Sequence, residues 1–310
     1  MAVLLWSSPD DPREIWIPEL ERGLPEVEVR AAPEFGDRAE IDYALVWKPE
    51  PGMLASLPNL KVIFSIGAGA DHILADPERP PQLPVVRMID GYLRDMMSEY
   101  ALLAVLYFHR FMPAYRREQA AEVWHRRWPH YTPETGIGLL GLGAIGQDIA
   151  EKLTRLGFPV HGWSRTPHQI SRITCHHGAG GLDEMLPHCR YLVCVLPLTE
   201  ATRGIINART LARLPAGAVV VNLGRGGHVV DEDLLAALDS GHLEGAFLDV
   251  FNAEPLPRGH PYWRHPKVVM TPHIAGEIVP RSAARSVAEN IRRHQRGEPL
   301  LGVLELDRGY

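Results

Sequence analysis

The 310-residue sequence has few cysteines, no net positive charge and no apolar run long enough to cross a lipid bilayer. Its longest tempting apolar stretch, Tyr100 to Phe108, ends at His109 and Arg110. The first residues, MAVLLWSSPDDPRE, lack the basic region and long apolar core of a secretion signal. From these absences we expect no membrane span, no leader peptide and a cytoplasmic protein.

The charge balance argues against nucleic acid and anionic lipid as partners. The formal net charge is -6, whereas binding to phosphate backbones or to a lipid surface needs clustered Lys and Arg. We therefore expect a small-molecule ligand.

The cysteines indicate reduced thiols and no metal. Cys175, Cys189 and Cys194 form no CxxC motif, and an odd number in a chain of this size favours free thiols. Cys175, His176 and His177 with Cys189 are conceivable zinc ligands, but their spacing fits no usual zinc site. The sequence predicts no metal.

What the sequence does contain is an alternation of apolar strands and helices. A chain of this length favours two domains, and 45% hydrophobic with 23% charged residues is typical of a globular protein. Continuous apolar strands separated by helices predict parallel sheets covered on both faces, an α/β fold. The expected strands are AVLLW, YALVW, KVIFS, IGLL, PVHGWSRT, YLVCVL, AVVVNL, GAFLDV and VVMTP.

Two helical stretches organise these strands into domains. One is expected from about Leu93, past Pro113, to about Trp124, where it would lead from the first sheet to the second. The other, residues 280–296, is amphipathic and is expected to pack back on the first domain. The first domain would then be built from both ends of the chain.

A glycine-rich turn is the strongest local motif. Gly141, Gly143 and Gly146 form G-x-G-x-x-G between an apolar strand and an amphipathic helix, which is the context that dinucleotide binding requires. Gly141 allows the tight turn, Gly143 lets the backbone approach a pyrophosphate, and Gly146 permits close packing of helix and strand. The helix amino terminus favours the anion.

The next strand indicates which dinucleotide is bound. An NAD site usually presents an acid to the adenosine ribose at this strand end, whereas this chain has Ser164, Arg165 and Thr166. Arg165 can bind a 2′-phosphate through charge-assisted hydrogen bonds, and the two hydroxyls can add donors. The sequence therefore favours NADP(H) over NAD(H), with a solvent-exposed Arg165 as the simpler alternative.

Polar residues follow three later strands, at Arg225, Asp249, Glu254 and His273. The carboxyl ends of parallel strands face the ligand crevice, so these side chains are expected to converge. Taken singly, each has an ordinary explanation: an ion-paired loop arginine, surface acids, and a histidine that packs beside a helix.

Several motifs in this order resemble the D-isomer-specific 2-hydroxyacid dehydrogenase family over nearly the whole chain. They are GLGAIG, LPLTEATRGIIN, VNLGRGGHVVDEDLLAALDSG, GAFLDVFNAEPLP and MTPHIAG. Within the family, SIGAGADHIL, PYWRHP, the terminal RGY and the missing acid before WSRT resemble the glyoxylate/hydroxypyruvate reductase A subgroup. The resemblance implies two doubly wound parallel-sheet domains: a Rossmann dinucleotide-binding domain, residues 98–274, inserted in a flavodoxin-like substrate-binding domain, residues 1–97 and 275–310.

The resemblance also implies roles for individual residues. Arg225 would bind the substrate carboxylate and polarise its carbonyl group, His273 would donate a proton, and Glu254 would orient His273. Trp47, Ala68 and Gly69 would contribute to the substrate site; a core tryptophan and a simple tight turn are the alternatives. The implied cofactor-binding residues are Gly141, Gly143, Ala144, Ile145, Gly146, Ser164, Arg165, Thr166, Leu196, Pro197, Thr202, Leu223, Gly224 and Asp249.

The predicted activity is NADPH-dependent reduction of a small 2-keto acid such as glyoxylate or hydroxypyruvate. Alternatives are an NAD-linked D-2-hydroxyacid dehydrogenase, a reductase of bulkier keto acids such as phenylpyruvate, and a dinucleotide-sensing protein like the corepressors that share the fold. The family commonly forms dimers, and the helical stretch from about Leu93 to Arg127 is rich enough in apolar and aromatic residues to form a homodimer interface.

Overall fold

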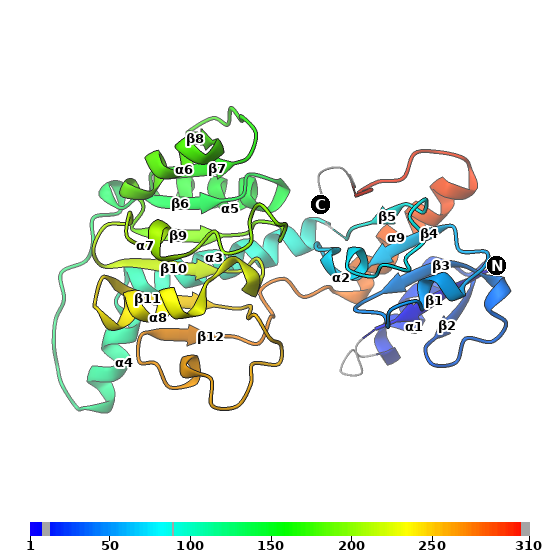
Figure 1. The fold of residues 1–310 in the computed structure, drawn as a ribbon, viewed down its shortest axis with the longest axis horizontal. Helices are drawn as coiled ribbons and strands as arrows, with labels where there is room; N and C mark the ends of the chain where they lie inside the picture. Colours follow the sequence, from blue (N-terminus) through cyan, green and yellow to red (C-terminus); the bar gives the residue numbers. More distant parts are fainter. Residues whose placement is uncertain (8–12, 89, 305–310) are drawn as a thin grey trace. The chain divides into compact units, whose positions relative to one another are not determined.

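The computed structural model describes residues 1–7, 13–88 and 90–304; the terminal RGY lies outside them. The chain forms two compact units. One consists of Met1–Leu93 and Gly276–Tyr310 and therefore uses both ends of the chain, and the other is Arg94–Ala275. Figure 1 shows the elements of each unit, which we describe separately.

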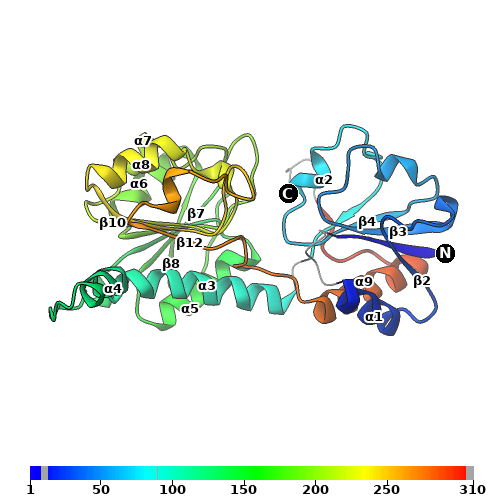
Figure 2. The same ribbon diagram turned by 90° about the horizontal axis from the view of Figure 1, so that it is seen from below.

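The unit built from both chain ends contains a five-stranded sheet in the order β2-β1-β3-β4-β5. Every pair of neighbouring strands is parallel, and this order is that of flavodoxin-like folds. Helices α1 and α9 lie on one face and α2 on the other (Figure 2). The elements are β1 (Ala2–Trp6), α1 (Arg13–Gly23), β2 (Glu28–Ala31), β3 (Ile41–Val46), β4 (Val62–Ser65), α2 (Asp71–Leu74), β5 (Val85–Val86) and α9 (Pro280–Gln295).

The apolar strands of this unit supply two cores because side chains alternate across a sheet. In β1, Val3 and Leu5 join the core beneath α1 and α9, whereas Ala2 and Leu4 join the core on the opposite face. The buried side of α9 is formed mainly by small residues, such as Ala284 and Ala288. These permit close contact with α1, where a Cβ at Gly23 would lie 3.4 Å from the Ala284 carbonyl oxygen.

The second unit contains a seven-stranded parallel sheet in the order β12-β11-β10-β9-β6-β7-β8. The chain enters at β6 and extends the sheet in both directions, so the strand order reverses between β6 and β9, as in Rossmann folds. The elements are α3 (Gly91–His109), α4 (Met112–Ala120), β6 (Ile137–Leu140), α5 (Ala144–Arg155), β7 (Val160–Ser164), β8 (Ile173–His177), α6 (Gly178–Met185), β9 (Tyr191–Cys194), α7 (Ala208–Leu211), β10 (Ala218–Asn222), α8 (Asp231–Asp239), β11 (Leu243–Leu248) and β12 (Val268–Met270).

Helices cover both faces of this sheet, with α3 and α5 on one side and α6, α7 and α8 on the other (Figure 2). The layer of α6, α7 and α8 covers a continuous apolar core that includes Leu192, Val220 and Leu234. On the first side α3 lies directly on β11, because a Cβ at Gly245 would come within 2.3 Å of the Phe108 ring. The predicted architecture of two parallel-sheet α/β domains is therefore confirmed.

One local prediction was wrong, and three strands were missed. The helix expected from about Leu93 to Trp124 is divided into α3 and α4 by Phe111, whose φ of 58° is left-handed, and α4 ends at Ala120. Pro113 lies in the first turn of α4, a position that proline tolerates, so it begins a helix. Three strands, β2, β5 and β8, were not predicted; they are short or partly exposed.

Candidate active site

Most predicted site residues of the second unit follow strands of one parallel sheet. The carboxyl ends of β6, β7, β9, β10, β11 and β12 lie at the same edge, because all neighbouring strands run in the same direction. In open α/β sheets this edge holds the ligand crevice. The fold thus brings loops that lie up to 130 residues apart in sequence to one edge of one sheet.

The glycine-rich turn has the geometry that a dinucleotide requires. Gly141 has a φ of 110°, which only glycine adopts readily, and a Cβ at Gly146 would lie 1.9 Å from the Gly141 carbonyl oxygen. In contrast, a Cβ at Gly143 would meet no atom within 4 Å. Gly143 and Ala144 are exposed at the start of α5. The helix amino terminus is therefore open to an approaching phosphate, and these residues fit a bound dinucleotide.

The turn after β7 contains Ser164, Arg165 and Thr166. Arg165 and Thr166 are exposed, whereas Ser164 is buried. The Ser164 hydroxyl lies 2.7 Å from the Thr166 carbonyl oxygen, to which it donates. The hydroxyl hydrogen of Ser164 is therefore used within the turn. Of these three side chains, Arg165 carries the charged donor group suited to a phosphate.

His273 and Glu254 are paired. Nδ1 of His273 lies 2.8 Å from Oε2 of Glu254, while Oε1 of Glu254 accepts a hydrogen bond from the Phe251 amide at 3.1 Å. Because a carboxylate only accepts, Nδ1 of His273 carries the hydrogen of this pair. His273 has a left-handed φ of 58°, so the position of this ring depends on its loop.

Asp249 holds that loop in place. Its Oδ1 accepts hydrogen bonds from Thr271 Oγ1 at 2.6 Å and from the Ile274 amide at 2.9 Å, and its Oδ2 accepts from the Ala275 amide at 2.9 Å. Its own carbonyl oxygen accepts from the amide of His273 at 2.8 Å. Asp249 is 1% exposed. This carboxylate therefore braces both sides of His273.

Arg225 lies in a loop with its own internal support. Its amide donates to Nδ1 of His228 at 3.1 Å, and its carbonyl oxygen accepts from Asn222 Nδ2 at 2.8 Å. Oδ1 of Asn222 also accepts from the Gly224 amide at 3.2 Å. Asn222 and His228 are fully buried, whereas Arg225 is half-buried. The backbone of Arg225 is thus fixed on both sides.

The loops after β9, β10 and β11 are in direct contact. A Cβ at Gly226 would lie 1.9 Å from the Phe251 carbonyl carbon, so only glycine fits between the loops of Arg225 and Glu254. The Pro197 carbonyl oxygen lies 2.7 Å from Thr202 Oγ1 and 3.3 Å from Nε2 of His228. These contacts place the predicted catalytic and cofactor-binding loops side by side.

The predicted substrate turn belongs to the other unit. Ala68 and Gly69 follow β4, and Trp47 follows the neighbouring strand β3. The Trp47 ring lies 4.5 Å from the His72 ring, and a Cβ at Gly67 would approach Trp47 at 3.2 Å. Trp47 thus packs against the turn that contains Ala68 and Gly69.

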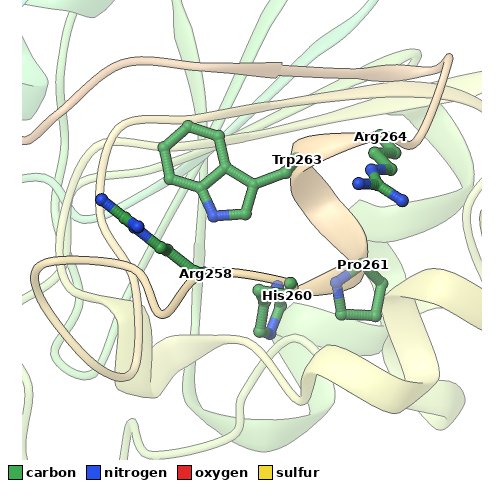
Figure 3. Close-up of a pocket in the computed structure, with 6 residues that line it drawn as sticks. Arg258, His260, Pro261, Trp263 and Arg264 are labelled. Carbon is green, nitrogen blue, oxygen red and sulfur yellow. The ribbon is translucent and has the colours of Figure 1, made fainter.

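A surface pocket of about 300 Å³ lies elsewhere in the second unit and contains no predicted site residue. In the view of Figure 3 the side chains of Arg258 and Arg264 lie on either side of Trp263. One short segment, 258–264, lines it.

Within the described ranges, no group of three or more His, Cys, Asp or Glu side chains is placed to hold a metal ion. Cys175, Cys189 and Cys194 are free cysteines, and Cys175 lies on strand β8. Over the same ranges, no helix has the length and apolar character needed to cross a membrane.

Comparison with known proteins identifies the family. The sequence model of the D-isomer specific 2-hydroxyacid dehydrogenase NAD binding domain matches residues 102–275. The chain belongs to the D-isomer specific 2-hydroxyacid dehydrogenase family. A glyoxylate/hydroxypyruvate reductase A of Serratia proteamaculans is 42% identical over 303 residues, 96% of each chain. One of Photorhabdus laumondii is 38% identical over 300 residues, 95% of this chain and 96% of its own.

Solved structures of the family agree with this assignment. A 2-hydroxyacid dehydrogenase from Xanthobacter autotrophicus, in complex with NADPH and MES, has a TM-score of 0.95 and 42% identity, covering 100% of this chain and 99% of that chain. An NADPH-dependent glyoxylate/hydroxypyruvate reductase from Sinorhizobium meliloti, in complex with NADP and sulfate, has a TM-score of 0.94, 38% identity and the same coverage. The predicted resemblance, and with it an oxidoreductase, is confirmed.

Sequence reasoning overlooked the residues of this dehydrogenase that support the site. His228 and the Phe251 amide were not singled out, and Asp249 was assigned only to the cofactor. His228 carries a usable signal, since it follows Arg225 by three residues in a glycine-rich turn. The Phe251 amide carries none, because any residue supplies an amide.

Proposed function

We propose that the protein reduces a small 2-keto acid of the glyoxylate or hydroxypyruvate type to the 2-hydroxy acid with NADPH. The observation that carries the proposal is the 2.8 Å pair of His273 and Glu254 at the sheet edge that also holds the glycine-rich turn. The names and bound cofactors of the relatives support the substrate class and NADP(H).

The proposed catalytic set is Arg225, Glu254 and His273. Arg225 binds the substrate carboxylate and polarises the neighbouring carbonyl group. His273 donates the proton from Nε2 to the developing alkoxide, while Glu254 fixes the ring and stabilises its positive charge. When bound, NADPH supplies the hydride. Trp47, Ala68 and Gly69, in the unit Met1–Leu93 with Gly276–Tyr310, are the further proposed substrate-binding residues.

The proposed cofactor site begins at the glycine-rich turn of the Arg94–Ala275 unit. Ala144 and Ile145 in the first turn of α5 bind the pyrophosphate, and Arg165 with Thr166 binds the 2′-phosphate. The loops after β9 and β10 line the site. Their residues are Leu196, Pro197, Thr202, Leu223 and Gly224.

Steady-state kinetics tests the proposal. We expect turnover of glyoxylate or hydroxypyruvate with NADPH and a lower kcat/KM with NADH, pyruvate and phenylpyruvate. His273→Gln should lower kcat by about 10²- to 10⁴-fold with little change in NADPH binding. The matched control is His265→Gln, which removes an imidazole that lies 3.2 Å from Asp239. Normal turnover of His273→Gln would refute the assignment, and NADPH binding without turnover would indicate a dinucleotide sensor.

We further propose a cytoplasmic homodimer that assembles through the arm from about Leu93 to Arg127. Three free cysteines suit a reducing compartment. In and beside the arm, Leu103, Val123, Trp124 and Trp128 are exposed to between 52% and 100%, and exposed apolar clusters commonly mark protein interfaces. Light scattering should give twice the chain mass, and Trp124→Glu should reduce it to the mass of one chain. An unchanged dimer in Trp124→Glu would exclude this interface.

A further inference from the structure

The turn after β7 contains a histidine that the proposed site does not use. Nδ1 of His168 lies 3.0 Å from the Thr166 carbonyl oxygen and 2.9 Å from Oγ of Ser164. A carbonyl oxygen only accepts hydrogen bonds, so Nδ1 carries a hydrogen. The Ser164 hydroxyl donates to the same carbonyl oxygen at 2.7 Å. The imidazole is therefore fixed to the turn through Nδ1.

This arrangement determines what the other ring nitrogen can do. With the hydrogen on Nδ1, a neutral ring presents the lone pair of Nε2, which repels an anion. A protonated ring presents an N–H donor and a positive charge. His168 is partly exposed and lies three residues after Arg165 in the same turn. A dianion held by Arg165 would therefore favour the protonated form of His168.

We propose that His168 recognises the 2′-phosphate of NADP(H) through Nε2 as an imidazolium ion, so that NADP(H) binds together with a proton. This inference rests on the proposed function and specifies how its cofactor preference arises. No covalent bond changes: one proton moves from solvent to Nε2. Discrimination against NAD(H) would then weaken as the pH rises.

Other charged or titratable side chains lie on β7, in this turn and on β8. Arg165 and Arg172 keep their charge at any physiological pH. On β8, His177 is in register with Ser164 of β7, whereas His176 is in register with Trp163 and lies 3.4 Å from His161. His177 is exposed and is therefore the histidine that competes with His168 for this role.

Calorimetry with adenosine 2′,5′-bisphosphate and with 5′-AMP tests the proposal without turnover. Titrations at pH 7 in buffers of different ionisation enthalpy give the number of protons bound. We expect the bisphosphate to take up roughly half a proton through His168, and its Kd to rise about fivefold from pH 6.5 to 8.5. Deprotonation of the phosphate, with a second pKa near 6, would instead release protons, so the sign separates the two sources.

Two variants assign the proton. His168→Asn keeps an amide donor for the Thr166 carbonyl oxygen but cannot be protonated, so proton uptake and the pH dependence of Kd should disappear. His177→Asn should retain both. His168→Lys should bind the bisphosphate with little pH dependence between pH 6.5 and 8.5, because its charge is permanent there.

The outcomes separate this inference from the proposed function. If the wild-type protein prefers the bisphosphate to 5′-AMP but takes up no proton, or if His168→Asn still takes one up, the inference is wrong and the NADP(H) preference stands. If the wild-type protein binds both nucleotides equally, the preference fails, and the inference fails with it.

Discussion

The backbone amide of Arg225 donates a hydrogen bond to Nδ1 of His228, 3.1 Å away, while Nε2 of His228 lies 3.3 Å from the Pro197 carbonyl oxygen. Nδ1 accepts and Nε2 donates, so this fully buried imidazole is neutral and its tautomer is fixed. His228 thus joins the loop of the proposed substrate-binding arginine to a loop of the proposed cofactor site.

Replacing His228 should loosen both loops. We expect His228→Ala to lower the free energy of unfolding by roughly 2–4 kcal/mol, since two buried hydrogen bonds and the ring are lost. It should also raise the keto acid KM, because the backbone of Arg225 is no longer held. Urea denaturation and steady-state kinetics measure the two effects. His242→Ala is the control. Nε2 of His242 lies 2.9 Å from the Leu211 carbonyl oxygen, and neither residue belongs to the proposed site. An equal rise in KM in both variants would contradict the positioning role.

The close approach at Gly226 predicts a strict requirement for glycine. A Cβ there would lie 1.9 Å from the Phe251 carbonyl carbon, so Gly226→Ala should separate the loops of Arg225 and Glu254. We expect a loss of about 1–3 kcal/mol of stability and at least a tenfold lower kcat/KM. Gly180→Ala in α6, where a Cβ meets no atom within 4 Å, should remain active. Near-normal kinetics of Gly226→Ala would show that the loops can separate without consequence.

The strands that could be predicted were those with continuous apolar runs, because burial on both faces demands such residues. The edge strands β8 and β2 do not meet that demand. The edge strand β8, ITCHH, is polar, and β2 at the edge of the other sheet is partly exposed. The left-handed φ of Phe111 was equally hidden, since local propensity disfavours it for a bulky residue.

The site likewise has features that could be predicted from the sequence and features that could not. In a parallel sheet the carboxyl ends of all strands lie on the same side. The sequence therefore predicted that Arg225, Glu254 and His273, which follow three such strands, lie together on that side. Contacts between loops depend on how the chain packs at long range. The Phe251 backbone against Gly226 therefore has no counterpart in any local pattern.

Asp249 provides a test of positioning against cofactor binding. In Asp249→Asn the side-chain NH2 group, which cannot accept a hydrogen bond, would replace an oxygen that now accepts one. We expect this to lower the free energy of unfolding by roughly 1–3 kcal/mol. We expect kcat to fall at least tenfold because His273 is displaced, while the KM for NADPH changes little. A rise in that KM parallel to the fall in kcat would instead support contact between Asp249 and the nicotinamide. Stopped-flow measurement of NADPH binding separates the two.

The lowered pKa values of His109 and His130 lead us to predict that acid destabilises the protein. The His109 ring is buried, lies 3.1 Å from Thr132 Oγ1 and packs on Phe158. Burial lowers the pKa of both histidines; the nearby His130 lowers the pKa of His109 further, and Arg190 that of His130. Because the pKa is lowered in the folded state, the unfolded chain binds protons first as the pH falls below about 6.5. The free energy of unfolding should therefore be constant above about pH 7 and decrease from there to pH 5.

The variant His109→Phe should make that decrease shallower. It keeps an aromatic ring against Phe158 and removes one group that must remain neutral in the folded protein. Some decrease will remain, because burial also lowers the pKa of His161 and of His176. Denaturant titrations at pH 5, 6, 7 and 8 measure the slope, and His177→Gln, at an exposed imidazole, should match the wild-type protein. If His109→Phe loses stability with acid as steeply as the wild-type protein, the buried imidazole is not a source of the acid sensitivity.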